Sequence, residues 1–316
     1  MENMKKISQP VRLIIFSLGI VSLLGACAVS TPTAVPSPTE TQQAAAPFEL
    51  DLEADGSPFI VYQGGYRFEA PLGSDVSIMG PSTTLSAEED ALLFKLDGLN
   101  KMSINRNAQE ILDILINTLF STDQSRVDKS DPITSAVEGY EGVAYDFTGT
   151  FLNHKVEGRA LVVKPSEKRY ISIIGMALVD DQPDLWQTTG KDFFNYLLNH
   201  YAILPEEEIA SADICPISPD ATYGFEVENA IKVGGGLKSG FLREKAYLDN
   251  LLGPDGSLVT YERVGSLESP DSIVDEYVLT VGTQVYRLFL DVYSYGVINA
   301  PRGLGCMGAF PLGEPW

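Results

Sequence analysis

The chain has 316 residues, 44% of them hydrophobic, and a formal net charge of −21 at pH 7. This acidic balance argues against nucleic acid, whose phosphates need patches of Lys and Arg, and against flat adsorption onto anionic lipid. It suits solubility outside the cell or a cationic partner.

The first segment combines positive charge with an apolar run. Lys5, Lys6 and Arg12 precede or begin a nearly unbroken apolar stretch from Val11 to Leu24. About 14 apolar residues are too few for a membrane span, which needs roughly 20, but suit the core of a signal peptide. The sequence therefore predicts an export signal over residues 1–26.

The apolar run ends in Leu24-Gly25-Ala26-Cys27, which resembles the lipobox of bacterial lipoproteins. The resemblance implies cleavage before Cys27 and attachment of acyl chains such as palmitate to its sulfur. The chain would then be held on the outer face of the cell membrane, because two or more acyl chains give stable anchoring. The alternative is an ordinary signal peptide in which the cysteine occurs by chance.

Residues 27–47 have the composition of a linker. The stretch is rich in Pro, Thr, Ser and Ala, and none of its aliphatic side chains is larger than Val. Such a segment buries too little apolar surface to offset the entropy of ordering. We expect a disordered spacer that lifts a folded body off the membrane, or a disordered tail with no spacer role. The mature chain of about 290 residues is long enough for two domains.

The first predicted domain covers residues 48–207 and begins with a hairpin. Residues 59–73 read as strand, Gly-Gly turn and strand, and short strands are expected at 91–98 and 101–107. Asn105 or Asn107 is a candidate cap for a helix over 108–120. Three strands of an antiparallel meander follow at 142–150, 155–164 and 169–177, and then a helix over 184–201. The order predicts an α+β sandwich.

This order resembles the PsbP-like α/β/α sandwich of lumenal photosystem proteins and of small bacterial envelope proteins. The resemblance rests on "GYRFEAP", "GRALVVKPSEKRYISIIGMA" and "DFFNYLL". It implies a binding or assembly module without catalytic activity, and it transfers no functional residue.

The second predicted domain, residues 208–316, is a smaller α+β unit. A turn-rich opening with one strand precedes a helix over 241–252, and strands follow at about 258–264 and on both sides of a Gly-Thr turn at 282–283. Parts of this segment resemble uncharacterised bacterial secreted proteins. Cys215 and Cys306 are the two cysteines left after Cys27, and in an exported chain they favour a disulfide closing this domain.

A search for catalytic or metal-binding chemistry gives weak signals only. His154 and His200 lie outside any metal-ligand spacing, so exposed or helix-capping roles are expected. Val233–Gly236 and Lys238 lack the spacing of a phosphate loop, and Gly253–Ser257 and Leu52–Pro58 lack the pattern of a calcium loop. No metal or cofactor is therefore expected.

Several charges lie within or beside apolar strands. Arg159 and Asp291 need partners if they are buried, or face water if they are not. Glu226 and Glu228 would share one face of a strand, as a cation site or as ordinary exposed alternation.

Together these features predict a membrane-anchored extracytoplasmic lipoprotein that binds or assembles with an envelope protein and is not an enzyme. Two alternatives stay open. One is an envelope hydrolase with a pair of carboxylates about 5–10 Å apart, and the other is a structural spacer.

Overall fold

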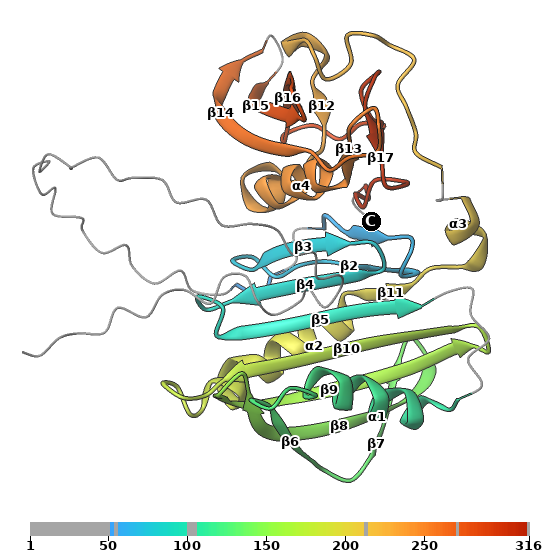
Figure 1. Cartoon of the computed structure of the whole chain (residues 1–316), viewed down its shortest axis with the longest axis vertical. Coiled ribbons are helices and arrows are strands. Elements are labelled where there is room, and N and C mark those ends of the chain that lie inside the picture. The colour runs from blue at the N-terminus through green and yellow to red at the C-terminus, as the bar shows by residue number, and fades with distance from the viewer. Residues whose placement is uncertain (1–50, 54–55, 100–105, 212–213, 270–271, 315–316) are drawn as a thin grey trace, which may run out of the picture. The chain divides into compact units, whose positions relative to one another are not determined.

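The computed structural model describes residues 51–53, 56–99, 106–211, 214–269 and 272–314 (Figure 1). The predicted signal peptide, Cys27 and the linker lie outside these residues, as does most of the strand expected at 101–107. Residues from Glu49 onward form one compact unit. We describe it as a meander region (51–211) and a C-terminal region (214–314).

The meander region is built on an antiparallel sheet with the strand order β3-β4-β5-β10-β9-β8-β6, and β7 pairs with β8 beside this path. A small separate sheet has the order β1-β2-β11. The strands are β1 (Phe59–Val61), β2 (Tyr66–Phe68), β3 (Asp75–Met79), β4 (Ser82–Ala87), β5 (Leu92–Leu99), β6 (Arg126–Lys129), β7 (Ile133–Val137), β8 (Tyr140–Phe151), β9 (His154–Ser166), β10 (Arg169–Leu178) and β11 (Tyr201–Ile203). The predicted antiparallel meander is confirmed as β8, β9 and β10, each slightly longer than expected.

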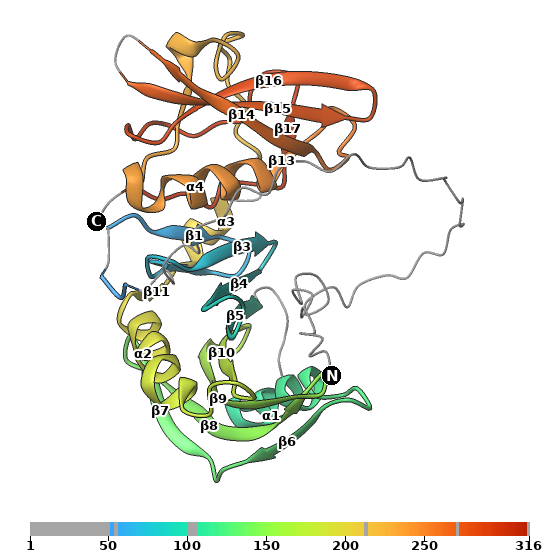
Figure 2. The same ribbon diagram turned by 90° about the vertical axis from the view of Figure 1, so that its left-hand side faces the viewer.

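Helices cover both faces of the large sheet (Figures 1 and 2). The helical elements are α1 (Ala108–Leu119), a π-helical turn η1 (Trp186–Gly190), α2 (Lys191–Asn199) and α3 (Glu206–Ser211). On one face Phe94 packs against Phe193, with ring centroids 4.1 Å apart. On the other face Phe120, which follows α1, contacts Phe147 edge to face. The strands are therefore apolar on both sides, which explains their continuous hydrophobic runs.

Local sequence accounts for the start of α1. Asn107 accepts a hydrogen bond from the Glu110 amide, and the Glu110 carboxylate accepts one from the Asn107 amide, both at 2.9 Å. This reciprocal pair satisfies two amides that the first helical turn leaves free. Of the two candidate caps in the sequence, Asn107 is the cap.

The second predicted helix ends earlier than its apolar pattern suggested. Helix α2 stops at Asn199, and Tyr201 begins β11, where it lies opposite Phe68 of β2. The Tyr201 ring stacks on Tyr66 at 5.2 Å. Tyr201 is thus buried by strand pairing, although its spacing also fits the buried face of a helix.

The C-terminal region contains a four-stranded sheet of order β12-β16-β15-β14 and one long helix. Its elements are a 3-10 turn η2 (Val227–Asn229), β12 (Ile231–Lys232), α4 (Gly236–Asn250), β13 (Leu251–Leu252), β14 (Thr260–Glu268), β15 (Ile273–Val281), β16 (Gln284–Asp291) and β17 (Gly305–Cys306). The α+β class predicted for the whole chain is confirmed.

Helix α4 begins five residues before the predicted start. Gly235, at its N-terminal cap, has φ of 97°, a left-handed conformation that glycine adopts without strain. This lets the chain turn directly from β12 into the helix. At the other end Leu251 pairs with Cys306, which is joined to Cys215 by a disulfide.

Helix α4 lies between the β14–β16 sheet and the strands β1 and β3 (Figure 2). One continuous apolar cluster includes Phe59 and Tyr66 of the meander region and Tyr247, Leu279 and Leu288 of the C-terminal region. The division into domains 48–207 and 208–316 stays a prediction, and a single core runs through both.

Candidate functional site

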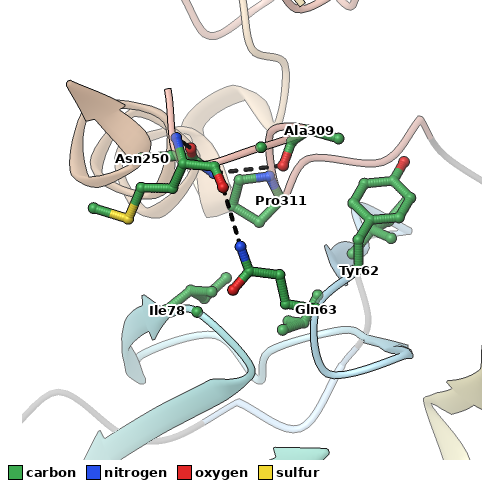
Figure 3. Close-up of a pocket in the computed structure, with 11 residues that line it drawn as sticks. Tyr62, Gln63, Ile78, Asn250, Ala309 and Pro311 are labelled. Carbon is green, nitrogen blue, oxygen red and sulfur yellow. Dashed lines mark hydrogen bonds between the residues drawn. The ribbon is translucent and has the colours of Figure 1, made fainter. Parts of the chain in front are cut away.

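A small cavity lies where the two regions meet (Figure 3). The turn between β1 and β2 forms one wall, with Tyr62 and Gln63, and the segment 307–311 forms the opposite wall. The side-chain amide of Gln63 donates to the carbonyl of Met307 at 3.0 Å. The cavity volume is about 30 Å³. That is far below the roughly 300–1,000 Å³ of typical ligand pockets, so this cavity is too small for a metabolite.

Asn250, the last residue of α4, orders the far wall of this cavity. Its side-chain oxygen accepts a hydrogen bond from the Met307 amide at 2.9 Å, and its side-chain nitrogen donates to the Ala309 carbonyl at 3.4 Å. One side chain thereby fixes the segment that faces Gln63. The junction cavity is a packed contact within the protein.

Arg243 joins segments that are distant in the sequence. Its side chain is 1% exposed and donates hydrogen bonds to three carbonyls, those of Val233 (2.6 Å), Pro58 (3.0 Å) and Gly313 (2.7 Å). Without Arg243, each of these carbonyls would accept fewer hydrogen bonds. Helix α4 is thus tied to the start of β1 and to the C-terminal segment.

Glu244, the next residue of α4, is buried on the side facing the sheet. The Tyr277 hydroxyl donates to Glu244 Oε2 at 2.8 Å, and Glu244 Oε1 is buried without a hydrogen-bond partner. Burial, assisted by the charge of Asp275, raises the pKa of Glu244 to about 8. Glu244 is therefore a neutral acid at neutral pH.

Asp275 lies beside Glu244 but stays ionised. Burial alone would raise its pKa, but hydrogen bonds from Arg263 and Ser266 outweigh that effect and lower it. Arg263 contacts both carboxylate oxygens of Asp275 at 2.8 Å. Two neighbouring carboxyl groups thus hold different protonation states, as in acid–base pairs of enzymes. Glu244 and Asp275 line neither the junction cavity nor the hollow of the meander region that is described next.

A wider hollow of about 270 Å³ opens on the meander region. Glu69, Glu138, His200 and Tyr201 line it. Glu69 Oε2 accepts from the Gly56 amide at 3.1 Å, and Glu138 Oε2 accepts from the Ile203 amide at 2.7 Å. The second oxygen of each carboxylate takes no part in these two hydrogen bonds.

Exposed apolar side chains concentrate on the C-terminal region. Among the described residues 17 large hydrophobic side chains are exposed, and 13 of them belong to this region: Ile214, Ile217, Leu237, Phe241, Leu258, Val264, Leu267, Ile273, Val285, Tyr293, Tyr295, Val297 and Met307. Single exposed apolar residues are normal, and only a contiguous patch of them indicates an interaction surface.

Strand β14 is the most open element of this region. It is the outer strand of its sheet, and no described strand pairs with its free side. Seven of its nine residues are exposed. They include Val264, which is 56% exposed at a bulge between Arg263 and Gly265, and Leu267, which is 39% exposed. A free, exposed edge of this kind can accept another strand.

Exposed or helix-capping roles were expected for the two histidines, and each has an ordinary partner in the structure. His154 contacts Asp180 at 2.9 Å on the surface. His200 caps the C-terminus of α2, where its ring contacts the Tyr196 carbonyl at 3.0 Å and stacks on the Tyr196 ring. His200 also lines the hollow of the meander region, which the sequence did not indicate.

The isolated charges find partners as expected. Arg159 is half-buried and bonds both oxygens of Asp146, at 2.7 and 3.1 Å. Asp291 is buried and accepts from the amides of Tyr293 and Ser294, at 2.8 and 3.2 Å. Both charges are therefore satisfied locally.

The strand expected at Glu226 and Glu228 is wrong. Residues 227–229 form the turn η2, because the Asn229 carbonyl accepts the Gly224 amide and closes a loop. The two carboxylates are exposed and do not share a strand face. Among the described residues, no group of three or more His, Cys, Asp or Glu side chains is arranged to hold a metal ion.

The glycine-rich stretch 233–236 forms the entry to α4, as its composition suggested, with Lys238 exposed in the first turn. In 253–257, Asp255 accepts from the Ser257 amide and hydroxyl at 3.0 and 2.6 Å. These bonds lower the pKa of Asp255. The loop has ordinary turn chemistry.

Sequence reasoning missed Arg243 and Glu244. Their only signal was the unusual breadth of the apolar pattern in α4, where Leu242, Ala246 and Leu248 surround them. A helix covered on both sides buries charged residues that a one-sided helix would expose.

No described helix is long and apolar enough to cross a bilayer.

Comparison with known protein families finds no matching family, and comparison with curated proteins finds no match. Among solved structures, this chain is similar to the cyanobacterial PsbP (CyanoP) of Synechocystis sp. PCC 6803, with 13% identity and a TM-score of 0.36, covering 52% of this chain and 98% of that one.

It is also similar to the Ran-binding protein Mog1p of Saccharomyces cerevisiae, with 7% identity and a TM-score of 0.37, covering 48% of this chain and 96% of that one. A third similar structure is LpqN of Mycobacterium tuberculosis, described as involved in cell envelope biogenesis, with 13% identity and a TM-score of 0.33, covering 44% of this chain and 83% of that one. At these values the likeness carries no argument about function.

Proposed function

We propose that this chain is an extracytoplasmic lipoprotein, held on the outer face of the cell membrane through Cys27, that acts as a non-catalytic binding or assembly module. Residues 27–47 act as the spacer, and the C-terminal region presents the binding surface. A protein of the cell envelope is the partner.

The exposed edge of β14 is the observation that carries this proposal. The outer backbone groups of the strand face no other described strand, and Val264 and Leu267 stand exposed beside them. An extended segment of a partner would add to this edge through main-chain hydrogen bonds, and the apolar side chains would select it. The bulge at Arg263–Gly265 limits uncontrolled pairing, because it bends the strand away from a flat edge.

Affinity capture of the full chain from gently solubilised source membranes tests the proposal. A stoichiometric protein partner is expected, and Val264→Lys with Leu267→Lys should reduce its recovery at least tenfold. Val285→Lys is a matched control, because Val285 is also exposed, at 65%, but lies on β16. Undiminished recovery with the double variant would show that β14 is not the binding edge.

The anchor is tested separately by Cys27→Ser. The variant should be released from membranes, because the acyl chains have no other attachment point in this proposal. A variant that stays membrane-bound and uncleaved would show that residues 1–26 span the membrane instead.

The hollow lined by Glu69 and Glu138 favours a second candidate, a hydrolase that uses a carboxylate pair. Its volume of about 270 Å³ lies near the lower end for ligand sites. The purified chain would be offered glycan and peptide fragments of the envelope. Turnover that is lost in both Glu69→Gln and Glu138→Gln would establish this function, and turnover unaffected by either would exclude the pair.

A further inference from the structure

Among the described residues, two stretches are the longest without an acidic residue. Asp and Glu make up 43 of the 316 residues, but residues 229–243 and 292–313 have none. The first stretch contains Lys232, Lys238 and Arg243, and the second contains Arg302. The net charge is therefore distributed unevenly along the sequence.

The fold brings these two stretches together. The Gly236 amide donates to the Val292 carbonyl at 2.7 Å, and the Gly296 amide donates to the Lys232 carbonyl at 3.1 Å. The Tyr295 hydroxyl accepts from the Gly235 amide at 3.1 Å. The N-terminal turn of α4 and the segment after β16 thus form one surface, at the end of α4 opposite to β13 (Figure 1).

This surface is apolar, aromatic and weakly basic. Leu237 and Val297 are 89% and 79% exposed, and Phe241 and Tyr293 are 61% and 47% exposed. Lys232 and Lys238 are exposed as well. We call the set Lys232, Leu237, Lys238, Phe241, Tyr293 and Val297 the acid-free surface.

We propose that the acid-free surface rests on an anionic phospholipid bilayer. Leu and Phe side chains gain free energy in the boundary between headgroups and acyl chains, and Tyr places an apolar ring there with its hydroxyl in water. Lys232 and Lys238 meet the lipid phosphates. The proposal rests on the lipid anchor proposed above and adds the orientation of the body on the membrane.

Two physical features favour a bilayer over a protein as the occupant. The nearest acidic residue in the sequence, Asp291, is 3% exposed and is held by the amides of Tyr293 and Ser294, so it does not face a bilayer. Acidic residues farther away than the Debye length, about 8 Å at physiological ionic strength, are screened. Four exposed apolar side chains form a contact much smaller than a stable protein interface, which buries about 800 Å² on each partner. The net negative charge of the chain argues against adsorption onto anionic lipid in general, but that argument does not apply to this surface.

Because the proposed anchor tethers the body to the membrane, a weak contact between the acid-free surface and the bilayer is enough to orient the body. Cys27 and Asp51, the first described residue, are 24 positions apart. A Pro-rich chain of that length, extended at about 3.1 Å per residue, reaches at most roughly 75 Å. Such a tether keeps the body at an effective concentration near the millimolar range, so even a contact with millimolar affinity is substantially occupied.

The test uses residues 27–316, which include the whole compact unit Glu49–Trp316. With Cys215 and Cys306 joined in a disulfide, the Cys27 thiol can be coupled to a maleimide lipid in vesicles of phosphatidylcholine and phosphatidylglycerol. Leu237→Trp then places a fluorophore on the acid-free surface. Leu258→Trp is the control, because Leu258 is 71% exposed but lies in the loop before β14.

The chain also contains Trp186 and Trp316, so the quenching of each variant is compared with that of the unsubstituted chain. Lipids brominated in their acyl chains should add strong quenching for Leu237→Trp and little for Leu258→Trp. Lys232→Glu combined with Lys238→Glu should lower the fraction in contact about tenfold or more, since each basic residue near an anionic surface contributes separately. Lys155→Glu with Lys168→Glu is the matched control on the meander region. Both of its lysines are exposed.

Equal quenching at positions 237 and 258, or none at either, would overturn the proposal. It would also be overturned if substitutions of the acid-free surface abolished recovery of a protein partner while quenching stayed absent. Because the vesicle link is chemical, these results do not depend on acylation of Cys27 in the cell. Failure of the anchor and failure of the lipid contact are thus distinguishable.

Discussion

The meander region and the C-terminal region reach a stable core by different means. The meander region buries aromatic side chains on both faces of a large sheet, such as Phe94 with Phe193 and Phe120 with Phe147. The C-terminal region has a four-stranded sheet and one long helix. It contains four of the six charged side chains that are buried in the described chain, together with the disulfide.

This difference reflects the scarcity of apolar surface in a small layered unit. The C-terminal region adds only a small sheet and one helix to the shared core, so a cross-link and specific polar contacts add to its stability. Most of the large apolar side chains that are exposed among the described residues also belong to this region. In the proposed function this region supplies the binding surface, and the meander region supports it.

The disulfide should have the largest effect on this comparison. Cys215→Ala with Cys306→Ala opens a loop of sequence separation 91. On the chain-entropy model this costs about 4–5 kcal/mol of unfolding free energy. Urea unfolding followed by fluorescence measures it. A loss under about 1 kcal/mol would show that the C-terminal region is held by its packing alone.

Arg243→Ala should follow closely, with a loss of about 3–5 kcal/mol in unfolding free energy. The substitution leaves the carbonyls of Val233 and Gly313 without their donor, whereas the Pro58 carbonyl keeps the Gly313 amide. Each unsatisfied buried group costs about 1–3 kcal/mol. The matched control is Arg302→Ala, since Arg302 is exposed. Equal stability of the two variants would contradict the assigned role of Arg243.

Glu244→Gln should flatten the pH dependence of stability. The folded chain raises the pKa of Glu244 to about 8 from its ordinary value of 4.5. The stability it contributes is therefore fully present below pH 4.5 and is lost as the pH rises through about 8, because the unfolded chain has already released the proton. Between pH 5 and pH 8 the native chain should lose about 2–4 kcal/mol more than the variant.

Urea unfolding at several pH values measures this difference, and Glu268→Gln, at an exposed position on β14, is the control. A control that flattens the profile as much as Glu244→Gln would assign the dependence to general charge repulsion instead.

The smallest expected effect compares one glycine from each region. A Cβ atom on Gly98 of β5 would lie 1.8 Å from the carbonyl oxygen of Gly64, whereas one on Gly265 of β14 meets nothing within 4 Å. Gly98→Ala should therefore cost about 1–3 kcal/mol through overpacking, and Gly265→Ala should leave stability within about 0.5 kcal/mol. Thermal unfolding of both variants checks this, and similar values would mean that the β1–β2 turn yields easily.

Sequence reasoning predicted the meander well, because its information is local. Alternating and continuous apolar runs around short turns predict β8, β9 and β10, and the cap at Asn107 predicts the start of α1. It failed where a distant partner decides the outcome. Tyr201 fits a helical face but pairs with β2, and the residues at 227–229 read as a strand but close a turn.

By itself the sequence determined the α+β class, the meander and its helices, since periodicity and capping act over a few residues. The tertiary structure decided which charges are buried and which surface is free of acid. Arg243 is satisfied by carbonyls at 58, 233 and 313, and the acid-free surface joins stretches about 60 residues apart. Such properties depend on contacts between segments that are distant in the sequence, and local sequence patterns do not predict those contacts.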